Sequence, residues 1–183
     1  MLYYTPKPRV KVFGLESFKK RGQFYMRSFE EVKPEFMKFP NVKTRLPERS
    51  DAKSAGYDFY SKENYVINPK ESHVFWTDVK VQMYFDNVLN IYARSGLGCK
   101  YGVVPKNCVG IIDASYYGNE KNDGGIGICL ENKGDEPYSV KVGDRIAQGV
   151  FTKYYITDDD KYVYGKEKDN GRKGGFGSSD EVK

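Results

Sequence analysis

Short apolar runs of strand length are the feature of this sequence that most constrains its fold. Between residues 54 and 155 these runs are three to six residues long, rich in β-branched or aromatic side chains, and bounded by Gly, Pro, Asn or Asp. Many such runs without a long helical repeat predict an all-β sandwich, barrel or jelly roll with little helix. The predicted strands are 65–67, 74–76, 79–83, 89–93, 109–112, 126–130 and 146–151.

Composition divides the 183-residue chain into three parts: an N-terminal extension over 1–40, a β domain over 41–156 and a C-terminal segment over 157–183. The extension holds the best helical candidate, residues 28–38, with Ser28 as a helix cap. The C-terminal segment is polar and glycine-rich, and it lacks the apolar content to fold alone. Two interpretations stay open for it, a disordered end or a mobile arm that orders over a ligand.

Composition also excludes several classes of protein and of site. No run of about 18 apolar residues is present and no apolar leader opens the chain, so we expect a cytoplasmic protein with no membrane partner. Cys99, Cys108 and Cys129 form no CxxC pair, and His73 is the only histidine, which argues against zinc sites and Ser-His-Asp catalysis. A basic surplus in residues 1–50 is dispersed, so no nucleic-acid partner is expected.

A glycine-rich loop after the strand predicted at 89–93 has the composition of a phosphate cradle. Arg94 and Ser95 are followed by Gly96 and Gly98. Glycine lets backbone N–H groups approach an anion, and an arginine guanidinium presents a planar fork that matches phosphate oxygens. An ordinary turn with a surface arginine is the alternative.

A carboxylate and an aromatic ring follow the strand predicted at 109–112. Asp113 ends that strand, and Tyr116 comes three residues later. A carboxylate held at the end of a buried strand can act as a general base. The alternatives are a capping aspartate and a core tyrosine, and the neighbouring Tyr117 can also supply the stacking ring.

Five short segments stand out along the chain: SAGYD at 54–58, RSGLG at 94–98, GIIDASYYG at 110–118, GDRIAQ at 143–148 and RKGGFGSS at 172–179. In this order they closely resemble the five ordered motifs of the trimeric dUTPase (deoxyuridine triphosphatase) family. The resemblance implies a homotrimer with a distorted jelly-roll or β-barrel fold and a flexible C-terminal arm. It also implies Mg²⁺-dependent hydrolysis of dUTP to dUMP and pyrophosphate, which limits uracil incorporation into DNA.

The resemblance also implies a role for individual residues. Asp113 would activate the attacking water, Tyr116 would pack on the deoxyribose, and the backbone around Gly127, with Gly110 close by, would recognise uracil. The triphosphate would be contacted by Arg94, Ser95, Gly96, Gly98 and Gln148. The arm would close over the nucleotide through Arg172, Phe176, Gly177, Ser178 and Ser179, and Lys173 can share the task of Arg172, which lies one residue closer to the glycines than is usual.

The role of Asp58 is left open between two interpretations. By resemblance, Asp58 contacts the metal through the water shell of Mg²⁺ or braces the phosphate loop. The alternative is a structural ion pair with Arg145.

An extra polar stretch, residues 120–125, departs from the compact family pattern. It is rich in Asn, Asp and Gly, and it predicts a lengthened hairpin turn. Comparable insertions in phage-borne members indicate a phage or prophage origin, with a host-cell cytoplasmic location. The stretch can also dock a protein partner, which makes a regulatory protein of this fold the alternative function.

The related dCTP deaminases are a further enzymatic alternative. By resemblance they need a glutamate three residues before an asparagine, and that position holds Cys129 here. Glu131 is expected on the opposite face of the strand, so deamination is disfavoured.

Overall fold

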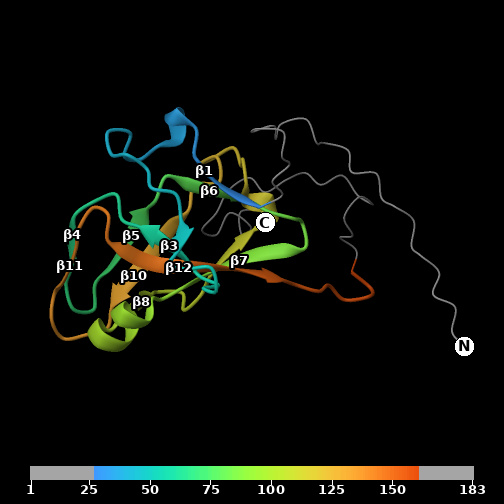
Figure 1. The fold of residues 1–183 in the computed structure, drawn as a ribbon. Coiled ribbons are helices and arrows are strands. Elements are labelled where there is room, and N and C mark those ends of the chain that lie inside the picture. The colour runs from blue at the N-terminus through green and yellow to red at the C-terminus, as the bar shows by residue number, and fades with distance from the viewer. Residues whose placement is uncertain (1–26, 161–183) are drawn as a thin grey trace, which may run out of the picture.

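The computed structural model describes residues 27–160, and nearly all of its regular structure is β-strand (Figure 1). The all-β prediction with little helix is therefore confirmed. The strands are β1 Ser28–Glu31, β2 Glu48–Arg49, β3 Tyr57–Tyr60, β4 Tyr65–Ile67, β5 Ser72–Trp76, β6 Val79–Gln82, β7 Asn87–Tyr92, β8 Val103–Pro105, β9 Gly110–Asp113, β10 Gly127–Asn132, β11 Tyr138–Val140 and β12 Arg145–Lys153. The helical turns are η1 Pro34–Phe36, η2 Gly96–Tyr101 and η3 Ala114–Tyr116.

The largest sheet has the strand order β2-β3-β12-β7-β9, and its strands pair antiparallel. β12 is its longest strand and runs through the middle of the view in Figure 1. The other sheets have the orders β5-β10-β8, β11-β4 and β1-β6. One core cluster joins these sheets, with Phe59, Phe75, Leu89 and Leu130 fully buried.

All seven strands predicted from apolar runs are present, but the predicted helix over 28–38 is wrong. Ser28–Glu31 is strand β1, paired with β6, and only the three residues Pro34–Phe36 form a helical turn. Packing explains the difference, because the Phe29 ring lies 5.6 Å from the Phe59 ring in the core. Pro34 also lacks the N–H that a continuing helix would need.

Two buried aspartates join the described part of the N-terminal extension to the rest of the fold. Asp78 accepts hydrogen bonds from the backbone N–H groups of Lys38 and Phe39 at 2.8 and 2.9 Å, and from Lys62 Nζ at 2.7 Å. Asp123 accepts one from the backbone N–H of Lys33 at 2.9 Å. Residues 28–39 are therefore held as part of the same β structure.

Candidate functional site

The first group of predicted site residues meets at one carboxylate. Asp58, on β3, accepts a hydrogen bond from Arg94 Nε at 2.8 Å and lies 3.3 Å from Arg145 Nη1. The Asp58 side chain is 7% exposed, Arg94 25% and Arg145 48%. One buried carboxylate therefore holds two guanidinium groups whose other ends approach solvent, an arrangement that can bind phosphate oxygens.

Gln148 belongs to the same group. It is the register partner of Asp58 across β12 and β3, so the two side chains lie on the same sheet face. Gln148 Nε2 donates to the Ala93 carbonyl at 3.0 Å, next to Arg94. A Cβ atom at Gly56 would lie 2.5 Å from Gln148 Oε1, so Gly56 leaves the space that this side chain occupies.

The glycine loop after Arg94 forms the helical turn η2. Ser95 is its capping residue, and the Gly98 N–H donates to the Arg94 carbonyl at 2.9 Å. A Cβ atom at Gly96 would meet no protein atom within 4 Å, whereas one at Gly98 would contact Val104 and Ala93 at ordinary distances. Gly96 is therefore the residue of this loop that leaves room for a ligand.

The second group surrounds Asp113, which ends β9 at the other end of the sheet. It occupies the N-cap position of η3, and its side chain makes no hydrogen bond to that turn. Asp113 is half-buried and lies near Tyr154. Burial raises the pKa of the Tyr154 hydroxyl, and the negative charges of Asp113 and Asp86 raise it further.

The two adjacent tyrosines take different partners. Tyr116 is buried, and its hydroxyl donates to the Gly125 carbonyl at 3.0 Å. Tyr117 donates to Glu30 Oε2 at 2.8 Å, and burial, with that hydrogen bond, raises its pKa. Tyr117 therefore serves the contact with strand β1.

The predicted hairpin turn over 120–125 is wrong. β9 pairs with β7, while β10 pairs with β5 and β8, so the two strands that flank the stretch do not pair with each other. The stretch folds back on itself instead: Asn119, Asp123, Gly124 and Gly125 are buried. Its polar groups form hydrogen bonds with Tyr116 and with neighbouring strands, so the stretch is not a hairpin turn.

The residues implied in uracil recognition lie in β9 and β10. A Cβ atom at Gly127 would lie 3.1 Å from the Trp76 ring, and one at Gly110 would lie 3.1 Å from Ile91 Cβ. The Cys129 carbonyl accepts a hydrogen bond from Lys106 N at 2.9 Å, on the β8 side. The N–H and C=O groups of successive residues in a strand point to alternate sides, so those of Gly127, two residues before Cys129, also face the β8 side. Gly127 lies beyond Pro105, the last residue of β8 that pairs with β10.

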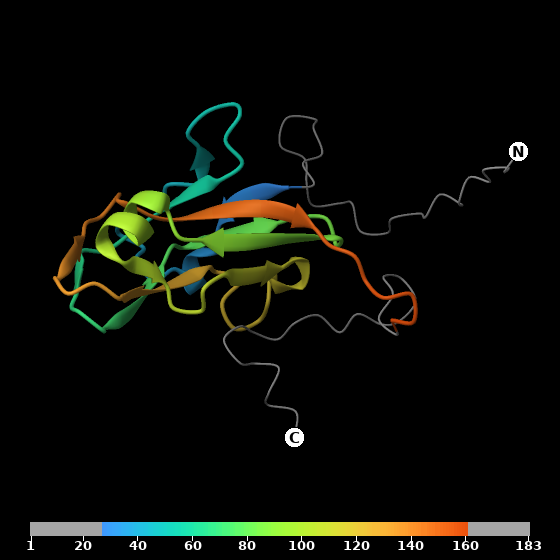
Figure 2. The same cartoon turned by 90° about the horizontal axis from the view of Figure 1, so that it is seen from below.

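Within one chain, the group around Asp58 and the group around Asp113 lie far from each other. Asp113 pairs with Val88 near the start of β7, whereas Arg94 follows the end of that strand. Six residues separate Val88 from Arg94, which corresponds to about 20 Å along an extended strand. Figure 2 shows η2 and the end of β9 at opposite ends of the sheet. Asp58, Gln148 and Asp113 nevertheless lie on the same sheet face, by the registers of β3, β12, β7 and β9.

The described residues do not form a direct metal site. Within 27–160, no group of three or more His, Cys, Asp or Glu side chains is arranged to hold an ion. Both oxygens of Asp58 lie against guanidinium groups, which fits the ion-pair interpretation and the bracing of the phosphate loop, while contact with Mg²⁺ through its water shell stays a prediction.

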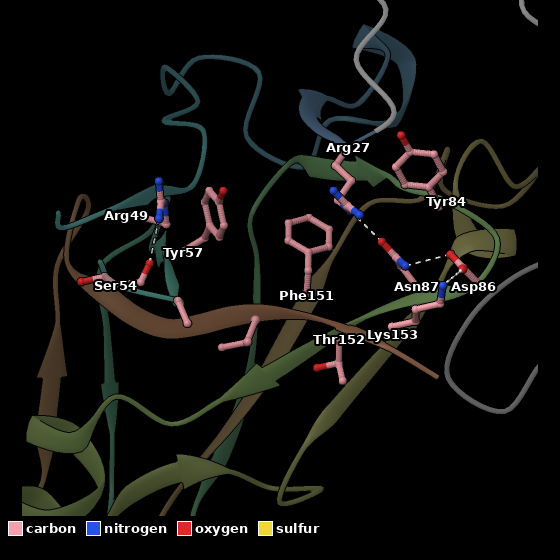
Figure 3. Close-up of a pocket in the computed structure, with 12 residues that line it drawn as sticks. Arg27, Arg49, Ser54, Tyr57, Tyr84, Asp86, Asn87, Phe151, Thr152 and Lys153 are labelled. Carbon is pink, nitrogen blue, oxygen red and sulfur yellow. Dashed lines mark hydrogen bonds and ion pairs between the residues drawn. The ribbon is translucent and has the colours of Figure 1, made fainter. Parts of the chain in front are cut away.

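A pocket lies beside residues 150–153, at the C-terminal end of β12 and away from the Arg94 and Arg145 guanidinium groups (Figure 3). Tyr57 and Phe151 line it, and Arg49 donates to the Ser54 carbonyl at its edge at 3.1 Å. Tyr57 precedes Asp58 in β3, so the two side chains point to opposite faces of the sheet. Val150 and Thr152 also line the pocket, and both lie on the same sheet face as Gln148, so the pocket borders that face as well.

Several predicted residues lie outside the described part of the chain. The arm residues Arg172, Lys173, Phe176, Gly177, Ser178 and Ser179 belong to this set. Within 27–160, no helix has the length and apolar character that crossing a membrane requires.

Two residues correct the sequence analysis. Glu131 lies on the same face of β10 as Cys129, not the opposite one, because side chains two residues apart share a face. Its carboxylate lies 3.7 Å from Lys133 Nζ. Arg145 joins Arg94 at the Asp58 carboxylate, and its position three residues before Gln148 in the fourth segment is the sequence signal for its place in this group.

Comparison with known proteins gives one consistent family. Residues 43–180 match the dUTPase family. The deoxyuridine 5'-triphosphate nucleotidohydrolase of Lactococcus lactis is 37% identical over 154 residues, covering 84% of this chain and 97% of the relative. The crystal structure of the dUTPase from Streptococcus mutans is 33% identical, with a TM-score of 0.62, over 71% of this chain and 98% of that one.

A phage protein has the same fold. A point mutant of the dUTPase from phage phi11 of Staphylococcus aureus is 25% identical, with a TM-score of 0.58, over 79% of this chain and 99% of that one; its structure is described as revealing the coordination of a structural Mg(II) ion. The ordered segments, the strand topology that positions them and these relatives agree, and the chain belongs to the dUTPase family.

Proposed function

We propose that this protein hydrolyses dUTP to dUMP and pyrophosphate, and thereby limits uracil incorporation into DNA. The observation that carries the proposal is the carboxylate of Asp58 holding Arg94 and Arg145 together on the sheet face that also carries Asp113. The family match over residues 43–180 supplies the nucleotide.

The first group binds the triphosphate. Asp58 holds Arg94 through Nε, so the two terminal nitrogens of Arg94 are the pair that faces a phosphate. Arg145 adds a second positive charge, and Gln148, Ser95, Gly96 and Gly98 complete the cradle. These positive charges stabilise the negative charge that develops on the pyrophosphate leaving group.

Asp113 is the general base in this proposal. Its carboxylate accepts a proton from water as that water attacks the α-phosphorus, and the bond from phosphorus to the bridging oxygen breaks to release pyrophosphate. The half-buried position of this carboxylate at the end of β9 supports this role. Tyr116 packs on the deoxyribose, a role favoured over Tyr117 by its position three residues after Asp113, which is the family spacing.

Uracil is recognised by backbone groups of β10. The orientation of Gly127 toward the side left open beyond β8 supports this role, with Gly110 close by. A strand edge that matches the uracil N–H and carbonyls sets donor against donor for cytosine, which leaves buried groups unpaired. This selectivity also disfavours dCTP deamination.

The active site is shared between copies in a homotrimer. The two groups lie about 20 Å apart along β7, which is too far for one nucleotide to meet both in a single chain. Exposed apolar side chains support contact with a second copy: Ile111 is 57% exposed on the face of Asp113, and Tyr155 is 90% exposed after β12. A neighbouring copy can therefore bring its Asp113 to Arg94, and the arms carry Arg172, Phe176, Gly177, Ser178 and Ser179.

Mg²⁺ is the proposed cofactor. Mg²⁺ prefers oxygen ligands and keeps several waters, so the substrate phosphates would hold it without a protein cage, and it would neutralise part of their charge. Asp58 acts by bracing Arg94, which agrees with the two guanidinium groups at its carboxylate.

Pyrophosphate release tests the proposal. The wild-type chain should release pyrophosphate from dUTP much faster than from dCTP, dTTP or UTP, and a chelator should stop the reaction. Asp113→Asn should abolish turnover, while the matched control Asp135→Asn, at an exposed position, should keep it. Release from all four nucleotides at similar rates, or from none, contradicts the proposed function.

A regulatory role through a protein partner is a second candidate, favoured by the similarity to the dUTPase of Staphylococcus phage 80alpha, 26% identical with a TM-score of 0.58, which is described as one of the phage dUTPases that control transfer of virulence genes. A cytoplasmic location, in the host cell for a phage-encoded chain, agrees with the nucleotide substrate. Affinity capture with and without dUTP tests this role: a partner retained only in one of the two conditions supports it, and no nucleotide-dependent partner counts against it.

A further inference from the structure

The folded stretch 119–125 makes close contact with the tyrosine of the third motif. Asn122 Nδ2 lies 2.7 Å from the Tyr116 hydroxyl and 3.0 Å from the Gly125 carbonyl. The Tyr116 hydroxyl itself donates to the Gly125 carbonyl at 3.0 Å. These three groups form a closed triangle, in which Asn122 donates to both of the other members.

Neighbouring side chains fix Asn122 in this orientation. Asn119 Nδ2 donates to Asn122 Oδ1 at 2.7 Å and to the Tyr116 carbonyl at 2.9 Å. The Asn122 Oδ1 atom also accepts the Gly124 N–H at 3.2 Å. With its oxygen turned toward these donors, the Asn122 amide must present its NH₂ group to Tyr116, so the hydrogen-bond pattern also determines the amide orientation.

The backbone of the stretch is fixed as well. Asp123 and Gly124 have φ values of 56° and 85°, and a Cβ atom at Gly124 would lie 2.9 Å from the Tyr116 carbonyl. Only glycine fits that contact, which brings the stretch against the Tyr116 backbone. Buried Asp123, bonded to Lys80 Nζ at 2.7 Å, ties the stretch to β6.

We propose that Asn122 is a positioning residue: it holds the Tyr116 ring where the ring discriminates deoxyribose from ribose. The inference rests on the proposed function, because it assumes that Tyr116 packs on the sugar. Tyr116 is joined to β9 by η3, a single turn of helix, and the hydroxyl end of its ring is anchored by a stretch that lies outside the compact motif pattern. Discrimination against a 2′-hydroxyl depends on close packing, so a ring that moves would admit UTP.

The experiment measures kcat/KM for dUTP and for UTP in the full-length chain. Asn122→Ala should lower the ratio of dUTP to UTP kcat/KM by about fivefold to tenfold, the effect of losing one buried hydrogen bond. Glu120→Ala, in the same turn but exposed, is the matched control and should keep the ratio. Thermal unfolding of each variant establishes that the fold is retained.

A double-mutant cycle separates positioning from a general structural role. In the Tyr116→Phe background, which removes the hydroxyl, Asn122→Ala should change the ratio much less than it does in the wild type. Equal losses of kcat/KM for both nucleotides, or additive effects in the cycle, overturn the inference while leaving the proposed function intact. A wild-type chain that hydrolyses neither nucleotide overturns the proposed function first, and the inference with it.

Discussion

Arg94 Nε donates to Asp58 Oδ1 at 2.8 Å, across 36 residues of sequence. Because the Asp58 carboxylate is buried and also lies against Arg145, it fixes the orientation of the Arg94 guanidinium, which in the proposed function contacts the phosphates. Asp58→Asn should therefore lower kcat/KM for dUTP by roughly tenfold to a hundredfold, the range expected for one hydrogen bond to a charged group. Steady-state kinetics measure this change. Asp135→Asn serves as the control. Unchanged kcat/KM in Asp58→Asn would show that the hydrogen bond from Arg94 to Asp58 is not required for activity.

Gly56 leaves the space that the Gln148 side-chain amide occupies. A Cβ atom there would lie 2.5 Å from Gln148 Oε1, so Gly56→Ala should push the amide away from the Ala93 carbonyl. The displaced group is the flexible end of a side chain, so the free energy of unfolding should change by less than about 1 kcal/mol. Activity should fall by roughly tenfold as the phosphate donor moves. Denaturant unfolding and kinetics on the same variant measure both; a large loss of stability with normal kcat/KM contradicts this assignment.

Two glycines should respond to alanine in opposite ways. A Cβ atom at Gly149 would lie 2.9 Å from both Leu89 Cδ1 and Phe59 Cε2, so Gly149→Ala should destabilise the fold by about 1–3 kcal/mol through overpacking. A Cβ atom at Gly96 would meet nothing within 4 Å, so Gly96→Ala should change stability by less than about 0.5 kcal/mol. If phosphate fills that space, Gly96→Ala should still lower kcat/KM for dUTP. Normal activity in Gly96→Ala would place the triphosphate elsewhere.

The buried Asp123 should make stability depend on acid pH. Burial alone would raise the pKa of its carboxyl, but the hydrogen bonds from Lys80 and from the Lys33 backbone, with the charges of both lysines, hold that pKa below its ordinary value of 3.8. A lowered pKa in the folded state stabilises the protein above the unfolded-state pKa, and this contribution is lost as the pH falls through the folded-state value. The free energy of unfolding should therefore fall below about pH 4.

Asp123→Asn tests the same contact. At pH 7 it leaves the Lys80 ammonium, whose side chain is 8% exposed, without its carboxylate, and it should cost about 3 kcal/mol. The variant should also lose less stability than the wild type between neutral and acid pH, as followed by denaturant unfolding at each pH. An identical acid dependence in both proteins would assign the acid sensitivity to other carboxylates.

The strands that can be predicted from the sequence are those with continuous apolar runs, such as Tyr65–Ile67, where the predicted and observed bounds agree. Tyr57–Tyr60 escapes prediction because its alternation includes a charged residue, Asp58, whose burial depends on two distant arginines. Ser28–Glu31 is predicted as a helix start because it contains local capping residues. Its strand conformation comes from pairing with β6, which the local sequence does not reveal. Tertiary pairing overrides local preference in both cases.

The candidate site is predictable as a set of motifs but not as an arrangement. The spacing identifies Arg94, Asp113 and Gln148, whereas the role of Arg145 beside Asp58 requires the register of β12 with β3. The stretch over 120–125 contains the turn residues of a hairpin. Its contact with Tyr116 arises from long-range packing that no local pattern describes.

The most direct test of the central claim, that the active site is shared between copies, is complementation between two inactive variants. Arg94→Ala and Asp113→Asn should each hydrolyse dUTP poorly alone. Co-expressed with different tags and purified through both, mixed trimers should recover activity approaching a third of the wild-type value, because each mixed trimer pairs an intact Arg94 with an intact Asp113 at one of its three sites. Mixed oligomers as inactive as either parent would contradict the claim and place both groups in the site of a single chain.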